Sequence, residues 1–124
     1  MSDVIIVDDH SEIVSILTQL LDSEGYIVRA FGDARRALES AREAPPGLAI
    51  VDLMMPLMNG AELIARLRAE VDPNLPIIAM SASSNAAQAR ALNVQRFIEK
   101  PFDLDDVVRQ VEDVAGPVLT RNMP

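Results

Sequence analysis

The sequence predicts an α/β fold, a doubly wound five-stranded parallel sheet with helices on both faces. Five short apolar runs, most of them rich in β-branched residues, alternate with segments of helical periodicity. Continuous apolar runs of this length suit strands that are buried on both faces. Regular alternation of strand and helix favours a parallel sheet with right-handed crossovers. A length of 124 residues is ordinary for a single domain, so we expect one.

The five predicted strands are the apolar runs themselves. They are VIIV at 4–7, YIV at 26–28, LAIV at 48–51, IIAM at 77–80 and FI at 97–98. Turn-forming residues separate them from the helical segments, for example PPG at 45–47 and DPNLP at 72–76.

Four amphipathic helices and one weaker helix are expected between and after these strands. Two of them begin after the candidate N-caps Asp33 and Asp103. An alanine-rich segment at 84–92 predicts only a short helix. The apolar stripes that define the four others are Ile13, Ile16, Leu17, Leu20 and Leu21; Ala34, Ala37, Leu38 and Ala41; Leu63, Ile64, Leu67 and Val71; and Leu104, Val107, Val108 and Val111.

Composition excludes several classes of function. The formal net charge is −8, so a nonspecific grip on nucleic acid is not expected, because phosphate neutralisation needs a basic surface. The chain has no cysteine, which rules out disulfides and thiolate metal sites and fits a reducing compartment. The first residues, MSDVIIVDD, do not predict a signal peptide, and no stretch predicts a membrane span.

Polar residues that carry chemistry stand directly after four of the five apolar runs. Asp8 and Asp9 follow the first run, Asp52 the third, Ser81 the fourth, and Lys100 stands close after the fifth. Ligands of such sheets collect at the carboxyl ends of the strands, so these side chains are expected to share one edge. Arg29 follows the second run and is expected to lie away from that edge.

Three neighbouring carboxylates repel one another and favour a bound cation. Oxygen ligands suit Mg²⁺, which keeps several waters beside one or two carboxylates. A serine hydroxyl and the chain's single lysine then point to a second anion on the metal, for which a phosphoryl group fits. A carboxylate can itself accept phosphoryl as an aspartyl phosphate. His10 has neither a second histidine nor a cysteine to join it, so we interpret it as a loop or helix-start residue.

Four motifs in order give the chain its resemblance to a known family. They are IIVDDH at 5–10, VDLMMPLMNG at 51–60, SAS at 81–83 and FIEKPF at 97–102. With these motifs the sequence resembles a response-regulator receiver domain of two-component signalling. The resemblance implies a flavodoxin-like sheet of strand order 2-1-3-4-5. It also implies a receiver domain over 1–116, followed by a C-terminal tail at 117–124.

The resemblance assigns a role to each matching residue. It implies that Asp52 is the phosphoacceptor and that Lys100 contacts the phosphoryl group. It implies that Ser81 is the switch hydroxyl and Phe97 the aromatic rotamer switch. Pro101 matches a proline whose preceding peptide bond is often cis. The implied ligands of Mg²⁺ are Asp8, Asp9, Asp52 and the main-chain carbonyl of Met54.

Two departures from the family pattern affect the region before the last strand. Asn93 stands where glycine is usual, and asparagine tolerates the left-handed conformation better than most residues. The spacing from Ser81 to Lys100 is shorter than usual by most of a helical turn. We therefore expect the fourth helix to be short or mobile.

The implied function is a phosphorylation-dependent switch in the cytoplasm. Its implied partners are a histidine kinase or histidine phosphotransfer protein and a downstream protein target, with no direct nucleic-acid or membrane binding. We do not expect an enzyme beyond catalysis of the chain's own phosphorylation and dephosphorylation. Two alternatives remain: a receiver-like interaction module that acts without phosphorylation, and a phosphatase using Asp52. The phosphatase is disfavoured because such enzymes usually carry a second acid where this chain has Met54.

Overall fold

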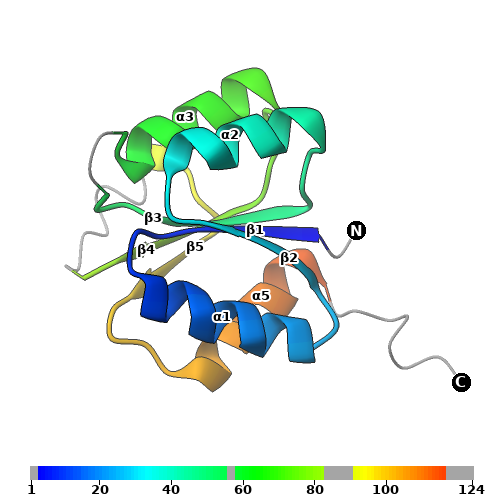
Figure 1. Cartoon of the computed structure of the whole chain (residues 1–124), viewed down its shortest axis with the longest axis vertical. Coiled ribbons are helices and arrows are strands. Elements are labelled where there is room, and N and C mark those ends of the chain that lie inside the picture. Colours follow the sequence, from blue (N-terminus) through cyan, green and yellow to red (C-terminus); the bar gives the residue numbers. More distant parts are fainter. Residues whose placement is uncertain (1–2, 56–57, 83–90, 117–124) are drawn as a thin grey trace, which may run out of the picture.

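The fold is a three-layer α/β sandwich built on one parallel sheet (Figure 1). The computed structural model of the chain describes residues 3–55, 58–82 and 91–116. The strand order is β2-β1-β3-β4-β5, as predicted. The strands are β1 (Asp3–Val7), β2 (Ile27–Phe31), β3 (Leu48–Asp52), β4 (Ile77–Ser81) and β5 (Arg96–Glu99).

Helices cover both faces of the sheet, which confirms the doubly wound arrangement. Figure 1 shows helices above the sheet and helices below it. The upper pair is α2 (Ala34–Glu43) and α3 (Gly60–Glu70), and the lower pair is α1 (Ser11–Ser23) and α5 (Leu104–Ala115). The helix expected at 84–92 falls mostly on residues 83–90, outside the described part of the chain, so its shortness stays a prediction.

The central strands divide the core between the two faces. In β1, Ile5 and Val7 belong to the core under α2 and α3, whereas Val4 and Ile6 belong to the core over α1 and α5. The strands β3 and β4 alternate in the same way, and every residue of both is buried. Burial on both faces is why these strands read as continuous apolar runs in the sequence.

The edge strand β2 differs most from its sequence pattern. The apolar run at 26–28 predicted a short strand, but β2 runs from Ile27 to Phe31 and includes Arg29. An edge strand is partly exposed, so polar residues interrupt its apolar pattern and hide its true length. The guanidinium of Arg29 contacts Asp3 at the start of β1, so the residue lies away from the carboxyl ends, as expected.

Helix starts follow the capping rules where the sequence indicated them. Asp33 accepts a hydrogen bond from the Arg35 amide at the start of α2, and Asp103 accepts one from the Asp105 amide at the start of α5. Each cap satisfies one of the backbone donors that a helix leaves unpaired in its first turn. The caps thereby fix where α2 and α5 leave the sheet edge.

Candidate functional site at the carboxyl edge of the sheet

Backbone hydrogen bonds continue past the strand ends and hold the functional residues in place. The Asp8 amide donates to Phe31 O at 3.1 Å, one residue beyond β1. The Leu53 amide donates to Met80 O at 2.9 Å, and the Lys100 amide donates to Ser81 O at 2.8 Å. The predicted convergence of residues from four strands at one sheet edge is therefore confirmed.

The Lys100 ammonium bridges two buried carboxylates. Its Nζ lies 2.9 Å from Asp8 Oδ2 and 3.3 Å from Asp52 Oδ2. Asp8 is fully buried, Asp52 is 1% exposed, and the lysine side chain is only 12% exposed. The chain's single lysine is thus the cation of its most buried acid cluster. A flexible stem that ends in a compact point charge can contact both carboxylates at once.

Asp8 and Lys100 stabilise each other's charged forms. Burial acts to raise the pKa of Asp8, but hydrogen bonds from Lys100 and the His10 amide outweigh it and hold this pKa below its ordinary value. Burial likewise acts to lower the pKa of Lys100, but Asp8 and Asp52 outweigh it and raise this pKa. Asp8 is therefore a carboxylate and Lys100 an ammonium at neutral pH.

Asp52 is the less well compensated member of the cluster. Burial, together with the neighbouring Asp8 charge, raises the pKa of Asp52 above its ordinary value. The Met54 amide, which donates to Asp52 Oδ1 at 3.0 Å, and Lys100 offset only part of this effect. A buried carboxylate with incomplete compensation is suited to bind a further cation or an electrophile.

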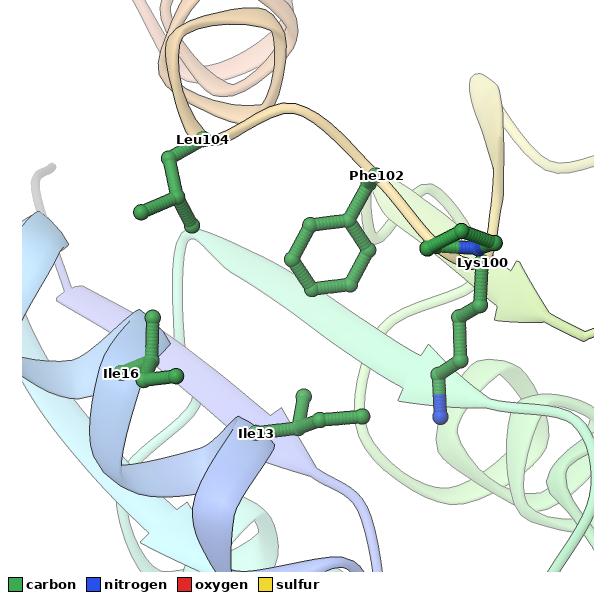
Figure 2. A pocket seen from close by; sticks show the side chains of 6 residues that line it. Ile13, Ile16, Lys100, Phe102 and Leu104 are labelled. Carbon is green, nitrogen blue, oxygen red and sulfur yellow. The ribbon is translucent and has the colours of Figure 1, made fainter.

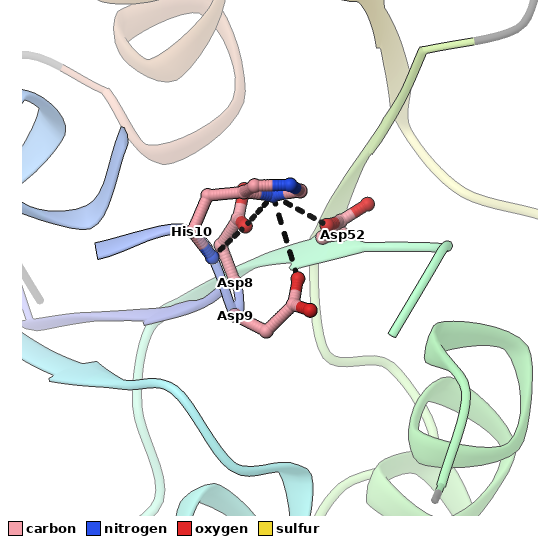
Figure 3. Close-up of side chains that lie close together, drawn as sticks. All are labelled: Asp8, Asp9, His10 and Asp52. Carbon is pink, nitrogen blue, oxygen red and sulfur yellow. Dashed lines mark hydrogen bonds and ion pairs between the residues drawn. The ribbon is translucent and has the colours of Figure 1, made fainter. Parts of the chain in front are cut away.

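The predicted metal ligands Asp8, Asp9 and Asp52 form a compact acidic cluster (Figure 3). One oxygen of each, together with one ring nitrogen of His10, lies within 4.8 Å of all the others. These carboxylates fit a hard divalent ion, which prefers oxygen ligands. Met54, the fourth implied ligand, follows in the loop after β3 and is 64% exposed, so its role as a main-chain ligand stays a prediction.

His10 is the residue whose contribution to the site we did not predict. It occupies the N-cap position of α1, which confirms a helix-start residue, but its side chain makes no capping hydrogen bond. Its ring instead lies over the carboxylates, with Nδ1 3.0 Å from Asp8 Oδ1 (Figure 3). The signal available in the sequence was its position, since a residue between an acidic pair and a helix start lies beside the strand end.

A close backbone approach fixes the loop that follows Asp52. A Cβ on Gly60, the first residue of α3, would lie 2.3 Å from Asp52 O and 2.6 Å from Leu53 Cα. Any other residue at this position would collide with the backbone beside the acid cluster. The N-cap Asn59 accepts a hydrogen bond from the Glu62 amide and holds the start of α3 against this loop.

The remaining predicted residues lie on or beside β4 and β5. Ser81 ends β4 and is buried, and Phe97 in β5 is half-buried against the core under α2 and α3. Asn93 has φ 55°, so the left-handed turn expected in place of the usual glycine is present. The peptide bond between Lys100 and Pro101 is cis, as the resemblance implied.

An apolar pocket of about 300 Å³ adjoins the Lys100 side chain (Figure 2). Ile13 and Ile16 of α1 line one side, and Phe102 and Leu104, leading into α5, line the other. Ile16 and Leu104 are 47% and 40% exposed, so two large apolar side chains face solvent beside the site. Large apolar side chains gathered at a pocket are a feature of protein contact surfaces.

The family follows from comparison with known proteins. The model of the response regulator receiver domain matches residues 4–112. The response regulator GtcR of Aneurinibacillus migulanus is 35% identical over 88% of this chain. The DNA-binding response regulator MtrA of Mycobacterium tuberculosis is 33% identical over 87% of it. The chain belongs to the response regulator receiver domain family.

Solved receiver structures share the whole fold. The chemotaxis protein CheY4 of Vibrio cholerae superposes with a TM-score of 0.85 at 26% identity, covering 92% of this chain and 98% of that one. The receiver domain of NtrX from Brucella abortus gives 0.84 at 27% identity, covering 91% and 98%.

The chain spans about half the length of the curated relatives it matches, 46% of GtcR and 48% of MtrA. Those regulators therefore contain further sequence with no counterpart in the matched region. Within the described ranges, no helix has the length and apolarity needed to cross a membrane.

Proposed function

We propose that the chain is a phosphorylation-dependent switch in which Asp52 accepts a phosphoryl group from a histidine kinase or histidine phosphotransfer protein. The observation that carries this proposal is the Lys100 ammonium held between Asp8 and Asp52 at the acidic sheet edge. In the transfer, an Asp52 oxygen forms the new P–O bond and the P–N bond of the phosphohistidine breaks. The departing imidazole nitrogen keeps the electron pair.

The residues of the chain prepare Asp52 for this reaction. The Met54 amide holds Oδ1, and Lys100 contacts Oδ2, so the carboxylate orientation is fixed before a donor arrives. Lys100 is then placed to follow a phosphoryl oxygen as charge builds up there. Mg²⁺, when held by Asp8, Asp9, Asp52 and the main-chain carbonyl of Met54, would supply positive charge to the phosphoryl oxygens.

Ser81 and Phe97 are proposed to carry the signal away from Asp52. The Ser81 hydroxyl would bond a phosphoryl oxygen, and the space it leaves would let Phe97 turn inward. The half-buried position of Phe97 supports this, because a ring between core and solvent can adopt two packings. A crystal structure with beryllofluoride should show the Phe97 ring moved; the same rotamer with and without it would contradict the coupling.

The apolar pocket beside Lys100 is the proposed contact surface for the phosphodonor. Its lining comes from α1 and from the segment between β5 and α5, and Lys100 itself forms one wall. A partner seated there would bring a phosphohistidine close to Asp52. The partner is therefore expected to present apolar side chains, in a cytoplasmic setting. The downstream target is proposed to be a protein, and we propose no nucleic-acid or membrane contact for this chain itself.

Intact mass after incubation with acetyl phosphate and Mg²⁺ tests the phosphoacceptor directly. We expect one added phosphoryl group, labile to base, in the wild-type protein. Asp52→Asn and wild type with EDTA should stay unmodified. Full labelling of Asp52→Asn would show that another residue accepts the group. No labelling of wild type by acetyl phosphate or by phosphohistidine donors would favour the interaction module that acts without phosphorylation.

A further inference from the structure

His10 places a nitrogen donor inside the acidic cluster. Its Nδ1 lies 3.0 Å from Asp8 Oδ1, 3.4 Å from Asp9 Oδ1 and 3.9 Å from Asp52 Oδ2 (Figure 3). Only the first of these distances is a hydrogen bond. The other two distances place the same nitrogen beside two further carboxylates, so the ring stands next to all three acids of the cluster.

The spacing of these atoms matches that of ligands around one ion. With metal–ligand bonds of about 2.1 Å, neighbouring ligand atoms stand roughly 3.0–3.4 Å apart and opposite ones about 4.2 Å apart. All four candidate ligand atoms lie within 4.8 Å of one another. Nδ1 is therefore at a ligand-to-ligand distance from each carboxylate.

From this geometry we infer that His10 is a specificity-determining ligand of the cation site, giving first-row transition ions such as Co²⁺ an advantage over Mg²⁺. The inference rests on the cation site of the proposed function and adds a nitrogen to its oxygen set. Mg²⁺ prefers carboxylate, carbonyl and water oxygens, whereas imidazole suits transition ions. With Mg²⁺ bound, water would take the place of the ring, whereas with Co²⁺ bound, His10 Nδ1 would serve as a ligand.

The imidazole can make this change without rearrangement of the fold. A carboxylate oxygen only accepts hydrogen bonds, so Nδ1 carries the proton in the bond to Asp8. Binding an ion through Nδ1 requires the other neutral tautomer, in which Nε2 carries that proton. The ring is 62% exposed, and its backbone is held separately by the bond from the His10 amide to Asp8 Oδ1 at 2.8 Å. The side chain can therefore turn while α1 keeps its start.

The test compares Co²⁺ and Mg²⁺ binding to untagged protein in wild type, His10→Asn and His10→Ala. His10→Asn keeps a good N-cap residue, and His10→Ala removes every side-chain donor. Calorimetry gives both affinities, and the visible spectrum of Co²⁺ reports nitrogen ligation. We expect the ratio of Co²⁺ to Mg²⁺ association constants to fall at least about tenfold in both variants. Mg²⁺ affinity should stay the same or rise.

Glu12→Gln is the matched control, because Glu12 lies in the first turn of α1 outside the cluster. The ratio of Co²⁺ to Mg²⁺ association constants in this variant should equal that of wild type. His10 is the chain's only histidine, so NMR of its ring is unambiguous: Co²⁺ should shift it strongly. If wild type binds both ions and the ratio is unchanged in the His10 variants, the inference is wrong and the proposed function stands. If wild type binds neither ion, the cation site of the proposed function fails as well.

Discussion

Two ion clusters at opposite ends of β1 show how a structural ion pair differs from the candidate functional site. Arg29 contacts Asp3, which is the first residue of β1. Lys100 contacts Asp8, which directly follows the last residue of β1. Both clusters join a partly or fully buried aspartate to a basic residue, Arg29 within β2 and Lys100 directly after β5. They differ in charge balance and in the geometry of the cation.

The Arg29 cluster is closed. Its guanidinium makes two hydrogen bonds to the Asp3 carboxylate, two to Ser40 and one to the Ala44 carbonyl. One cation is paired with one carboxylate. The planar guanidinium donates its hydrogen bonds to acceptors that the fold holds in place. Nothing in this arrangement calls for a further ion. The cluster ties β1, β2 and α2 together, which is a structural role.

The Lys100 cluster is open. One ammonium faces the buried carboxylates of Asp8 and Asp52, and the Asp9 carboxylate lies beside them. The raised pKa of Asp52 reflects this incomplete compensation. The candidate site thus differs from the Arg29 ion pair in its excess of negative charge and in a cation carried on a flexible stem. Each of the following predictions tests this difference.

Replacing Lys100 should have the largest effect on stability. In Lys100→Met without divalent ions at neutral pH, we expect the free energy of unfolding to fall by about 3 kcal/mol, because two buried carboxylates lose their cation. Mg²⁺ should restore much of the lost stability. The affinity of the variant for Mg²⁺ should equal or exceed that of wild type, since the substitution removes a positive charge from the site. Urea unfolding with and without Mg²⁺ measures both. A large drop in Mg²⁺ affinity would mean that Lys100 organises the metal site.

Replacing Arg29 should give a smaller loss that Mg²⁺ does not specifically repair. We expect Arg29→Met to lower the free energy of unfolding by about 2 kcal/mol, because Asp3 and two backbone carbonyls lose charged hydrogen bonds. The stabilisation gained from Mg²⁺ should equal that of wild type, since the proposed ion site lies at the other end of β1. A greater Mg²⁺ gain in this variant than in wild type would show that the two clusters are coupled.

Neutralising Asp52 should give the smallest effect, and in the opposite direction. The pKa of Asp52 is raised in the fold. Between the ordinary aspartate pKa and this raised pKa, the folded state binds more protons than the unfolded state, so stability falls as pH rises through that range. Asp52→Asn should therefore be more stable than wild type at neutral pH in EDTA, by on the order of 1 kcal/mol.

The pH dependence separates this explanation from a simple packing change. The advantage of Asp52→Asn should shrink as pH falls from the raised pKa of Asp52 to the ordinary aspartate pKa, and it should be lost below that value, where the wild-type carboxyl is neutral in the folded and the unfolded state. Asp8 acts in the other direction, because its lowered pKa gives stability that is lost at acid pH in both proteins. Urea unfolding across a pH series in EDTA checks this. An Asn variant that is less stable than wild type at neutral pH would contradict the open-cluster interpretation.

Much of the fold could be predicted because local pattern and buried sheet agree. The central strands β3 and β4 are apolar along their lengths since both faces are covered, and Asp33 and Asp103 cap helices where the sequence indicated. The edge strand β2 was predicted poorly. Its partial exposure admits Arg29 into its middle, and the partners that explain this residue lie 26 positions earlier at Asp3 and 11 and 15 positions later at Ser40 and Ala44.

The sequence by itself determined which residues meet at the carboxyl edge of the sheet. Chain order and parallel topology require Asp8, Asp52, Ser81 and Lys100 to converge there, whatever the details of packing. Tertiary structure alone decided how their charges are shared. The asymmetry between Asp8 and Asp52, and the position of the His10 ring over the carboxylates, depend on burial and on distances of a few ångströms. Electrostatic energy changes steeply over such distances in a buried site, and sequence spacing does not encode them.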